Sequence, residues 1–159
     1  MFQLRWPILL AFAAAFLFAA GCDKGGKTND QKDKPKNEHA HPDKGPHGGV
    51  LIEWGEEDYH LEFTVDHKTQ VATVYVLDET AKKAKPIKAK EITLTLKLTP
   101  PVTVKLAAKP DSGDPAGASS RFVGTHEALG KEQEFAGEVK GEVDGKPYVG
   151  DFAEKPHKH

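Results

Sequence analysis

Apolar side chains alternate with polar ones from Val50 onwards, and this spacing of two constrains the fold more than any other feature of the chain. Successive side chains of a β-strand point to opposite faces, so the alternation indicates strands that bury one face. It is clearest at 59–65 and 92–98, whereas 71–77 is apolar on both faces and predicts a central strand. Similar segments occupy 50–54, 102–106, 137–143 and 146–152. The sequence therefore predicts an all-β domain, a small antiparallel sandwich or barrel of about seven strands without a convincing helix.

Two turns set the expected strand registers: a four-residue loop at 55–58 and the strong hairpin signal Asp144-Gly145. Counting outward from them gives the opposed pairs Trp54 with Tyr59, Val50 with Phe63, Val143 with Lys146, Gly141 with Tyr148 and Gly137 with Phe152. Proline cannot donate to a strand ladder. Pro100-Pro101 therefore predicts a bend, which we interpret as a crossing between two sheets, and Pro147 places the last strand at a sheet edge.

The N-terminus has a basic Arg5, an apolar stretch from Trp6 to Ala20 and then small residues, a pattern typical of a secretion signal. The motif Ala19-Ala20-Gly21-Cys22 resembles the lipobox of bacterial lipoproteins. The resemblance implies cleavage after residue 21 and lipidation of Cys22. The protein would then be held by acyl chains on the inner or outer membrane, facing the periplasm. The alternative is an uncleaved N-terminal helix in which Cys22 is an incidental thiol.

The chain is expected to divide into four parts. Residues 1–21 are the signal peptide, and 22–47 form a disordered tether rich in lysine and histidine, because that stretch contains almost nothing apolar to bury. Residues 48–153 form the β domain, and 154–159 form a tail that bears histidines.

The single cysteine excludes a disulfide framework. The charges nearly balance, with 22 basic and 24 acidic residues, which argues against a nucleic-acid partner.

The eight histidines offer the only evident chemistry. Imidazole is the commonest side-chain ligand of transition metals, and short histidine-rich tracts are a compositional sign of metal binding. His39, His41 and His47 lie in the expected tether, whose flexible backbone would let them wrap Zn²⁺, Cu²⁺ or Ni²⁺. In the alternative interpretation they are solvated spacers, because a disordered segment lacks the surrounding groups that orient metal ligands.

The first hairpin suggests a second group of candidate ligands. Continuing its register places His47 opposite Asp66 and beside His67, a set that suits Zn²⁺ or Cu²⁺. The same register puts three polar residues together on the solvent face of the hairpin: Glu53, His60 and Glu62. An ordinary charged outer face is the alternative for these three, and we interpret His126 as an isolated loop residue.

Three motifs between residues 45 and 78 resemble a segment near the start of some periplasmic adaptor subunits of heavy-metal efflux pumps, and of small bacterial lipoproteins. They are His47-Gly48-Gly49, Tyr59-His60-Leu61-Glu62-Phe63 and Val74-Tyr75-Val76-Leu77-Asp78. The resemblance implies a β domain exposed to the periplasm and a connection with metal ions. The chain has no room for the helical hairpin and lipoyl-like domain of those adaptors, so it is not expected to bridge a pump and an outer-membrane channel.

The sequence contains no GxSxG, glycine-rich phosphate loop or HExxH motif, so we do not expect an enzyme. We expect a membrane-anchored lipoprotein that binds transition-metal ions, as an accessory of metal efflux or homeostasis, with an efflux or envelope protein as partner. The expected ligands are His39, His41 and His47, then His60 and His67. Capture by neutral imidazoles would weaken as the pH falls through about 6.5. The alternative is a non-enzymatic interaction module that docks a protein through an edge strand or the lysine-rich connector 82–90.

Overall fold

The computed structural model describes residues 44–154, which form eight strands and one short 3₁₀ helix. The strands are β1 (Val50–Trp54), β2 (Tyr59–Asp66), β3 (Val71–Leu77), β4 (Glu91–Leu96), β5 (Val102–Ala108), β6 (Arg121–Thr125), β7 (Ala136–Val143) and β8 (Lys146–Ala153). The helix η1 (Glu127–Gly130) joins β6 to β7. Hydrogen-bonded neighbours follow the order β1-β2-β3-β6-β5-β4-β7-β8, and every pair is antiparallel. The all-β prediction is confirmed, with one strand more than expected.

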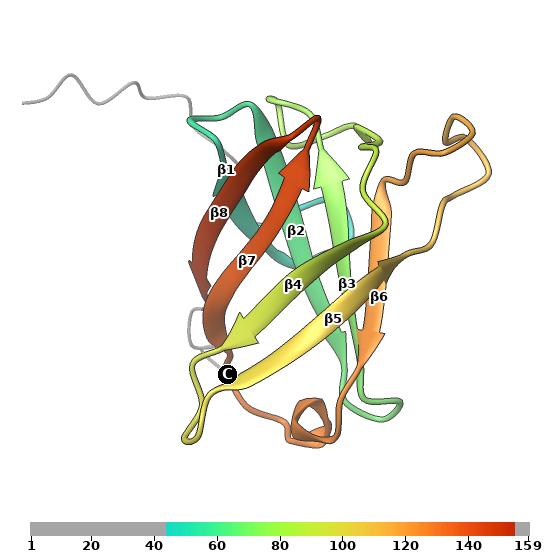
Figure 1. The fold of residues 1–159 in the computed structure, drawn as a ribbon. Helices are drawn as coiled ribbons and strands as arrows, with labels where there is room; N and C mark the ends of the chain where they lie inside the picture. Colours follow the sequence, from blue (N-terminus) through green and yellow to red (C-terminus); the bar gives the residue numbers. More distant parts are fainter. Residues whose placement is uncertain (1–43, 155–159) are drawn as a thin grey trace, which may run out of the picture. The chain divides into compact units, whose positions relative to one another are not determined.

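The sheet curls until its two end strands lie side by side, so that the fold is a nearly closed barrel (Figure 1). A glycine permits the close approach of β8 to β1, because a Cβ on Gly150 would clash with the carbonyl oxygen of Glu53. Asp58, in the loop after β1, accepts hydrogen bonds from Lys146 Nζ at 3.1 Å and from the Tyr148 hydroxyl at 3.2 Å. The hydrogen bond from Lys146 is the largest of the causes that lower the pKa of Asp58. The loop after β1 is thus fastened to β8.

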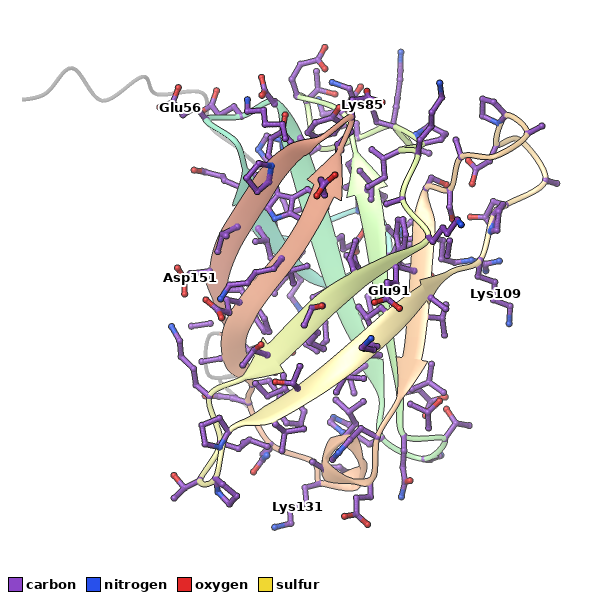
Figure 2. All side chains as sticks on the ribbon, in the orientation of Figure 1. Glu56, Lys85, Glu91, Lys109, Lys131 and Asp151 are labelled. Carbon is purple, nitrogen blue, oxygen red and sulfur yellow. The ribbon has the colours of Figure 1, made fainter. Side chains whose placement is uncertain are left out.

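Inward-facing apolar side chains fill the barrel, whereas charged side chains such as Glu91, Lys109 and Asp151 project from its outside (Figure 2). The largest fully buried side chains are Trp54, Phe63, Phe122, Phe135, Ile52, Leu61, Leu77, Ile92, Leu94, Leu96, Leu106 and Leu129. Trp54 has no exposed surface, and its indole Nε1 donates to the carbonyl oxygen of Val139 at 3.0 Å, which joins β1 to β7 across the interior. The absence of a side chain at Gly141 makes room for this ring, because a Cβ there would lie 2.6 Å from the ring atom Cη2.

Both predicted hairpin registers are confirmed. The first hairpin pairs Trp54 with Tyr59 and Val50 with Phe63, and the last pairs Val143 with Lys146, Gly141 with Tyr148 and Gly137 with Phe152. The strand β8, which contains Pro147, stands at one end of the strand order, as the proline predicts. Each register was fixed by a short loop whose length leaves few ways to pair the flanking strands.

Two expectations about the middle of the chain are wrong. Pro100-Pro101 does not carry the chain between sheets, because β4 and β5 on either side of it pair directly from Glu91 with Ala107 to Leu96 with Val102. The prolines bend a hairpin loop instead. The strand β6 was not predicted, since its five residues hold Gly124 and lack strict alternation. It separates β3 from β5, so its presence is what completes the barrel.

Candidate functional site

The chain reverses direction just before it enters β1. The backbone N–H of Gly45 donates to the Gly49 carbonyl and that of Gly48 donates to the Gly45 carbonyl, both at 3.0 Å, and Lys44 forms an isolated bridge with Val50. Gly48 has φ of 82°, in the left-handed region that favours glycine. Residues 44–47, expected to be the end of a disordered tether, are therefore folded against the barrel. We call residues 44–49 the N-terminal reversal.

The N-terminal reversal brings His47 over Glu62, a residue on the outer face of β2. Oε1 of Glu62 accepts the backbone N–H groups of His47 at 2.7 Å and Gly49 at 2.8 Å, and Oε2 lies 2.7 Å from Nδ1 of His47. An ionised carboxylate only accepts, so Nδ1 is the donor in this pair. Glu62 has no exposed surface. These three donors compensate the burial of the Glu62 carboxylate, because a buried charge without hydrogen-bond partners costs several kcal/mol.

Two glycines allow the N-terminal reversal to lie directly on Glu62. A Cβ on Gly45 would clash with the Glu62 carboxyl group, and one on Gly49 would clash with the Phe63 carbonyl oxygen and lie 2.6 Å from Cγ2 of Thr64. The predicted solvent face of Glu53, His60 and Glu62 is therefore wrong for two of its members. Glu53 is exposed, but Glu62 is covered by these glycines, and His60 is 1 % exposed.

The imidazole ring of His47 lies flat on Tyr75, with ring centroids 3.7 Å apart and planes 6° apart. Tyr75 is the cross-strand partner of Glu62. The two side chains that hold the His47 ring are therefore a directly opposed pair in the β2–β3 ladder. The His47 side chain is 44 % exposed. A carboxylate on Nδ1 fixes the tautomer and the direction of an imidazole and leaves the lone pair of Nε2 for another group. The geometry can therefore present a metal ligand or a hydrogen-bond acceptor at the barrel surface.

His60, which lies on the same face of β2 as Glu62, contacts a second loop. Its Nδ1 lies 3.1 Å from the carbonyl oxygen of Asp78, which follows β3. The Asp78 carboxylate accepts hydrogen bonds from the Thr80 hydroxyl at 2.7 Å and from the backbone N–H groups of Thr80, Lys82 and Lys83. Burial raises the pKa of Asp78, but these hydrogen bonds outweigh it and lower that pKa to about 2. The loop at 78–83 is thus held in one conformation, with His60 buried beneath it.

The structure does not bring His47, Asp66 and His67 together. Nδ1 of His67 lies 2.8 Å from the Leu129 carbonyl oxygen, and Asp66 accepts the backbone N–H groups of the turn at 67–70. The predicted meeting assumed that the β1–β2 ladder continues to His47, whereas the N-terminal reversal turns that residue back toward Glu62. His126 caps η1, because its Nδ1 accepts the N–H of Ala128 at 3.1 Å.

A cavity of about 260 Å³ lies beside the stacked rings of His47 and Tyr75. Its other lining residues come from the N-terminal reversal, from β3, from the loop and connector after β3, and from the segment that precedes β6: Pro46, Val76, Leu77, Lys82, Ala84, Asp111 and Ser120. Neither Tyr75 nor Lys82 was singled out from the sequence as a site residue. The β2–β3 register could have pointed to Tyr75 through its pairing with Glu62, but only the folded loop places Lys82 at the cavity.

Several predicted site residues lie outside the described residues: Cys22, His39 and His41, together with the predicted signal peptide and the histidines of the tail. Between residues 44 and 154, no three histidine, cysteine, aspartate or glutamate side chains form a group that could hold a metal ion. Within the same range, no helix is long and apolar enough to cross a membrane. The metal and lipid predictions therefore remain predictions.

No protein-family model, curated protein or solved structure matches this chain. The site is therefore interpreted from its own geometry.

Proposed function

We propose that this protein is a lipid-anchored protein of the bacterial cell envelope that binds a transition-metal ion, with His47 as the ligand that the barrel holds in place. The observation that carries the proposal is the hydrogen bond from Nδ1 of His47 to the buried carboxylate of Glu62. Histidines that bind metals almost always donate their other ring N–H to a carboxylate, a carbonyl or water in this way. The stacked Tyr75 ring adds a second restraint on the same imidazole.

The further ligands of the ion would come from His39 and His41, which precede His47 by eight and six residues. An extended chain spans up to about 3.3–3.6 Å per residue, so both imidazoles are within reach of an ion at Nε2 of His47. Imidazole nitrogens suit Zn²⁺, Cu²⁺ and Ni²⁺ alike. His60 and His67 are less suitable, because each directs Nδ1 to a backbone carbonyl and lies partly or fully beneath other residues.

Calorimetric titration of the full-length chain in detergent with Zn²⁺, Cu²⁺ and Ni²⁺ tests the proposal. We expect saturable binding of at least one ion and its loss in His47→Ala. Glu62→Gln should weaken binding about 10–100-fold, the usual effect of removing the group that orients a ligand. His126→Ala is the matched control, because its ring caps η1 far from the N-terminal reversal in sequence. Binding that is absent with all three ions, or unchanged in a His39, His41 and His47→Ala triple variant, would refute the metal function and favour a protein-interaction module.

Membrane anchoring requires its own test, since it rests on the sequence around Cys22. We expect mass spectrometry of the mature protein to find Cys22 at its N-terminus with attached acyl chains. Cys22→Ser should move the protein from the membrane fraction to the soluble fraction. An unmodified Cys22 in a membrane-bound protein would overturn the lipoprotein assignment.

A further inference from the structure

The connector between β3 and β4 concentrates the positive charge of the barrel. Residues 79–90 contain five lysines and one glutamate, whereas the rest of 44–154 contains nine basic and eighteen acidic residues. The connector therefore has a net charge of +4 on a domain that is otherwise acidic. Charge of one sign gathered on one part of a surface attracts partners of the opposite sign over about 8 Å at physiological salt.

Four lysines of this connector are exposed and have no acidic partner. They are Lys82, Lys83, Lys88 and Lys90, and we call them the connector lysines. Among residues 44–154, no carboxylate lies within ion-pair distance of any of their ammonium groups. The fifth, Lys85, differs from them, because its Nζ lies 3.8 Å from the Glu79 carboxylate and 4.5 Å from the centroid of the Tyr59 ring.

The connector backbone is fastened to the barrel, so the connector lysines project from a fixed support. The Asp78 carboxylate accepts the backbone N–H groups of the first two at 3.2 and 3.3 Å. Ile87 exchanges two backbone hydrogen bonds with Ser119 and is 2 % exposed, which holds the chain just before the last two. Figure 2 shows the middle of the connector, marked by Lys85, at one end of the barrel.

The surroundings of the connector lysines suit a partner that is recognised through charge alone. The core of a protein–protein interface is depleted in charge and enriched in aromatic anchors. Among residues 44–154, Val149 of β8 is the only large hydrophobic side chain that is exposed, so the connector offers no such anchor. Anionic lipid headgroups require none, because the potential of a charged membrane surface attracts a lysine cluster directly.

The chain enters the described fold beside the connector. Pro46 of the N-terminal reversal and Lys82 line the same cavity of about 260 Å³, and the exposed Lys44 adds a further positive charge to this entry point. Cys22 precedes Lys44 by 22 residues, which span at most about 3.3–3.6 Å each. An acyl anchor at Cys22 would therefore keep a membrane within reach of the connector.

We infer that the connector lysines dock the barrel onto the anionic headgroups of the membrane that anchors it. The inference does not involve metal binding, and it rests on the proposed lipid anchor only to keep the membrane near. Outside the connector the domain has more acidic than basic residues, so an anionic surface repels the rest of the barrel. Attraction at the connector and repulsion elsewhere together select one orientation of the barrel on the membrane.

Lysine labelling of the full-length protein on vesicles tests this contact. The protein is bound to vesicles of phosphatidylcholine alone, or of equal parts phosphatidylcholine and phosphatidylglycerol, and is briefly treated with acetic anhydride before mass spectrometry. We expect the connector lysines to react at least threefold more slowly on the anionic vesicles. Lys68 and Lys131 should react equally on both, because Lys131 lies at the opposite end of the barrel from Lys85 (Figure 2) and His67, beside Lys68, contacts the Leu129 carbonyl there. Salt at about 1 M, which shortens the Debye length to about 3 Å, should remove the difference.

The exposed Lys109 reports the same contact in a variant without the connector lysines. The residue before it donates its backbone N–H to the Lys90 carbonyl at 2.8 Å, so Lys109 lies next to the connector. We expect anionic vesicles to slow its reaction in the wild type but not after four charges are removed together: Lys82→Gln, Lys83→Gln, Lys88→Gln and Lys90→Gln. The matched control removes four charges from exposed lysines elsewhere and should keep the slow reaction: Lys68→Gln, Lys97→Gln, Lys131→Gln and Lys140→Gln.

Equal labelling of the connector lysines on both kinds of vesicle, or slowing that persists at high salt, would overturn this inference and leave the lipid anchor standing. Connector lysines that react freely on anionic vesicles but are protected in isolated cell envelopes would also overturn it, in favour of an acidic protein partner. A protein that does not float with phosphatidylcholine vesicles would refute the anchor. Flotation with anionic vesicles that is lost in the connector variant would then still support the docking surface, and no flotation at all would overturn both.

Discussion

The Glu62 carboxylate holds both the backbone N–H and the ring Nδ1 of His47, a residue 15 positions earlier in the chain, at 2.7 Å each. The outer face of β2 is consequently covered at His60 and Glu62 and exposed only towards its end at Asp66. Glu62 holds the N-terminal reversal, and two residues earlier His60 contacts the loop at 78–83 through the Asp78 carbonyl. One strand thus positions two of the segments that border the cavity.

Removing the Glu62 carboxylate should destabilise the barrel. Glu62→Ala leaves three donors without their acceptor, and we expect it to lower the free energy of unfolding by about 2–4 kcal/mol. Glu62→Gln keeps one oxygen acceptor and should cost about half as much. Urea denaturation monitored by circular dichroism measures both changes. Glu53→Gln, on the exposed side of β1, should stay within about 0.5 kcal/mol, and equal losses at the two positions would contradict the anchoring role of Glu62.

A side chain at Gly49 should be poorly tolerated. The Cβ of Gly49→Ala would clash with the Phe63 carbonyl oxygen, a backbone atom inside a paired strand that cannot easily move. We expect a loss of about 2 kcal/mol or more in the free energy of unfolding, typical of overpacking. Gly113→Ala is the matched control, because nothing lies within 4 Å of the place its methyl group would take, and it should be neutral or slightly stabilising. Thermal unfolding of both variants checks the difference, and a stable Gly49→Ala protein would argue against the tight packing of this segment.

The tight contact between Trp54 and Gly141 should appear as an energetic coupling. Gly141→Ala introduces a methyl 2.6 Å from the Trp54 ring and should destabilise the wild type by about 2–3 kcal/mol. Trp54→Phe removes that part of the ring and the hydrogen bond to Val139, at a cost of about 2 kcal/mol. The double variant should be more stable than the sum of the two losses predicts, by about 1 kcal/mol. A double-mutant cycle of urea midpoints measures this term, and strict additivity would contradict the contact.

The Asp78 carboxylate should make stability depend on pH in the acid range. Its pKa in the folded chain is about 2, below the ordinary value of 3.8, so its contribution is complete above about pH 4 and is lost as the pH falls toward about 2. Asp78→Asn retains an oxygen acceptor but not the charge. We expect it to lower the free energy of unfolding at pH 7 by about 1 kcal/mol and to flatten the profile between about pH 4 and 2.

Urea titrations at a series of pH values from about 2 to 7 measure this effect. Thr80→Val removes the hydroxyl that donates to Asp78 at 2.7 Å and should produce a smaller change in the same pH range. An acid profile of Asp78→Asn that coincides with that of the wild type would show that the loop does not depend on this carboxylate.

Local sequence signals were sufficient for the strand pairs that a short turn connects. Asp144-Gly145 defines the register of β7 and β8, since a two-residue turn leaves one way to oppose Val143 and Lys146. The strand β6 has no such signal. It lies between β3 and β5, neither of which a short turn joins to it, and its pairing is determined by the closure of the whole barrel.

The candidate site could be predicted only in part for a related reason. His47 was singled out by its glycine neighbours, but its partner was taken to be Asp66, because a ladder was extended through a segment that reverses. The sequence shows which face of a strand a residue occupies, and it does not show whether a loop covers that face. The burial of Glu62 and the placement of Lys82 both depend on such loops.

The attachment of the N-terminal reversal at Glu62 also has a mechanical consequence. A pull on the chain before Lys44 reaches the barrel first through the hydrogen bonds at Glu62 and the backbone bonds of residues 45–49, before it can load the ladder between β1 and β2. If acyl chains at Cys22 fix the protein to a membrane, these bonds are the link that bears the tension. The N-terminal reversal is therefore the first part of the described fold that such a pull would load, ahead of the strands of the barrel.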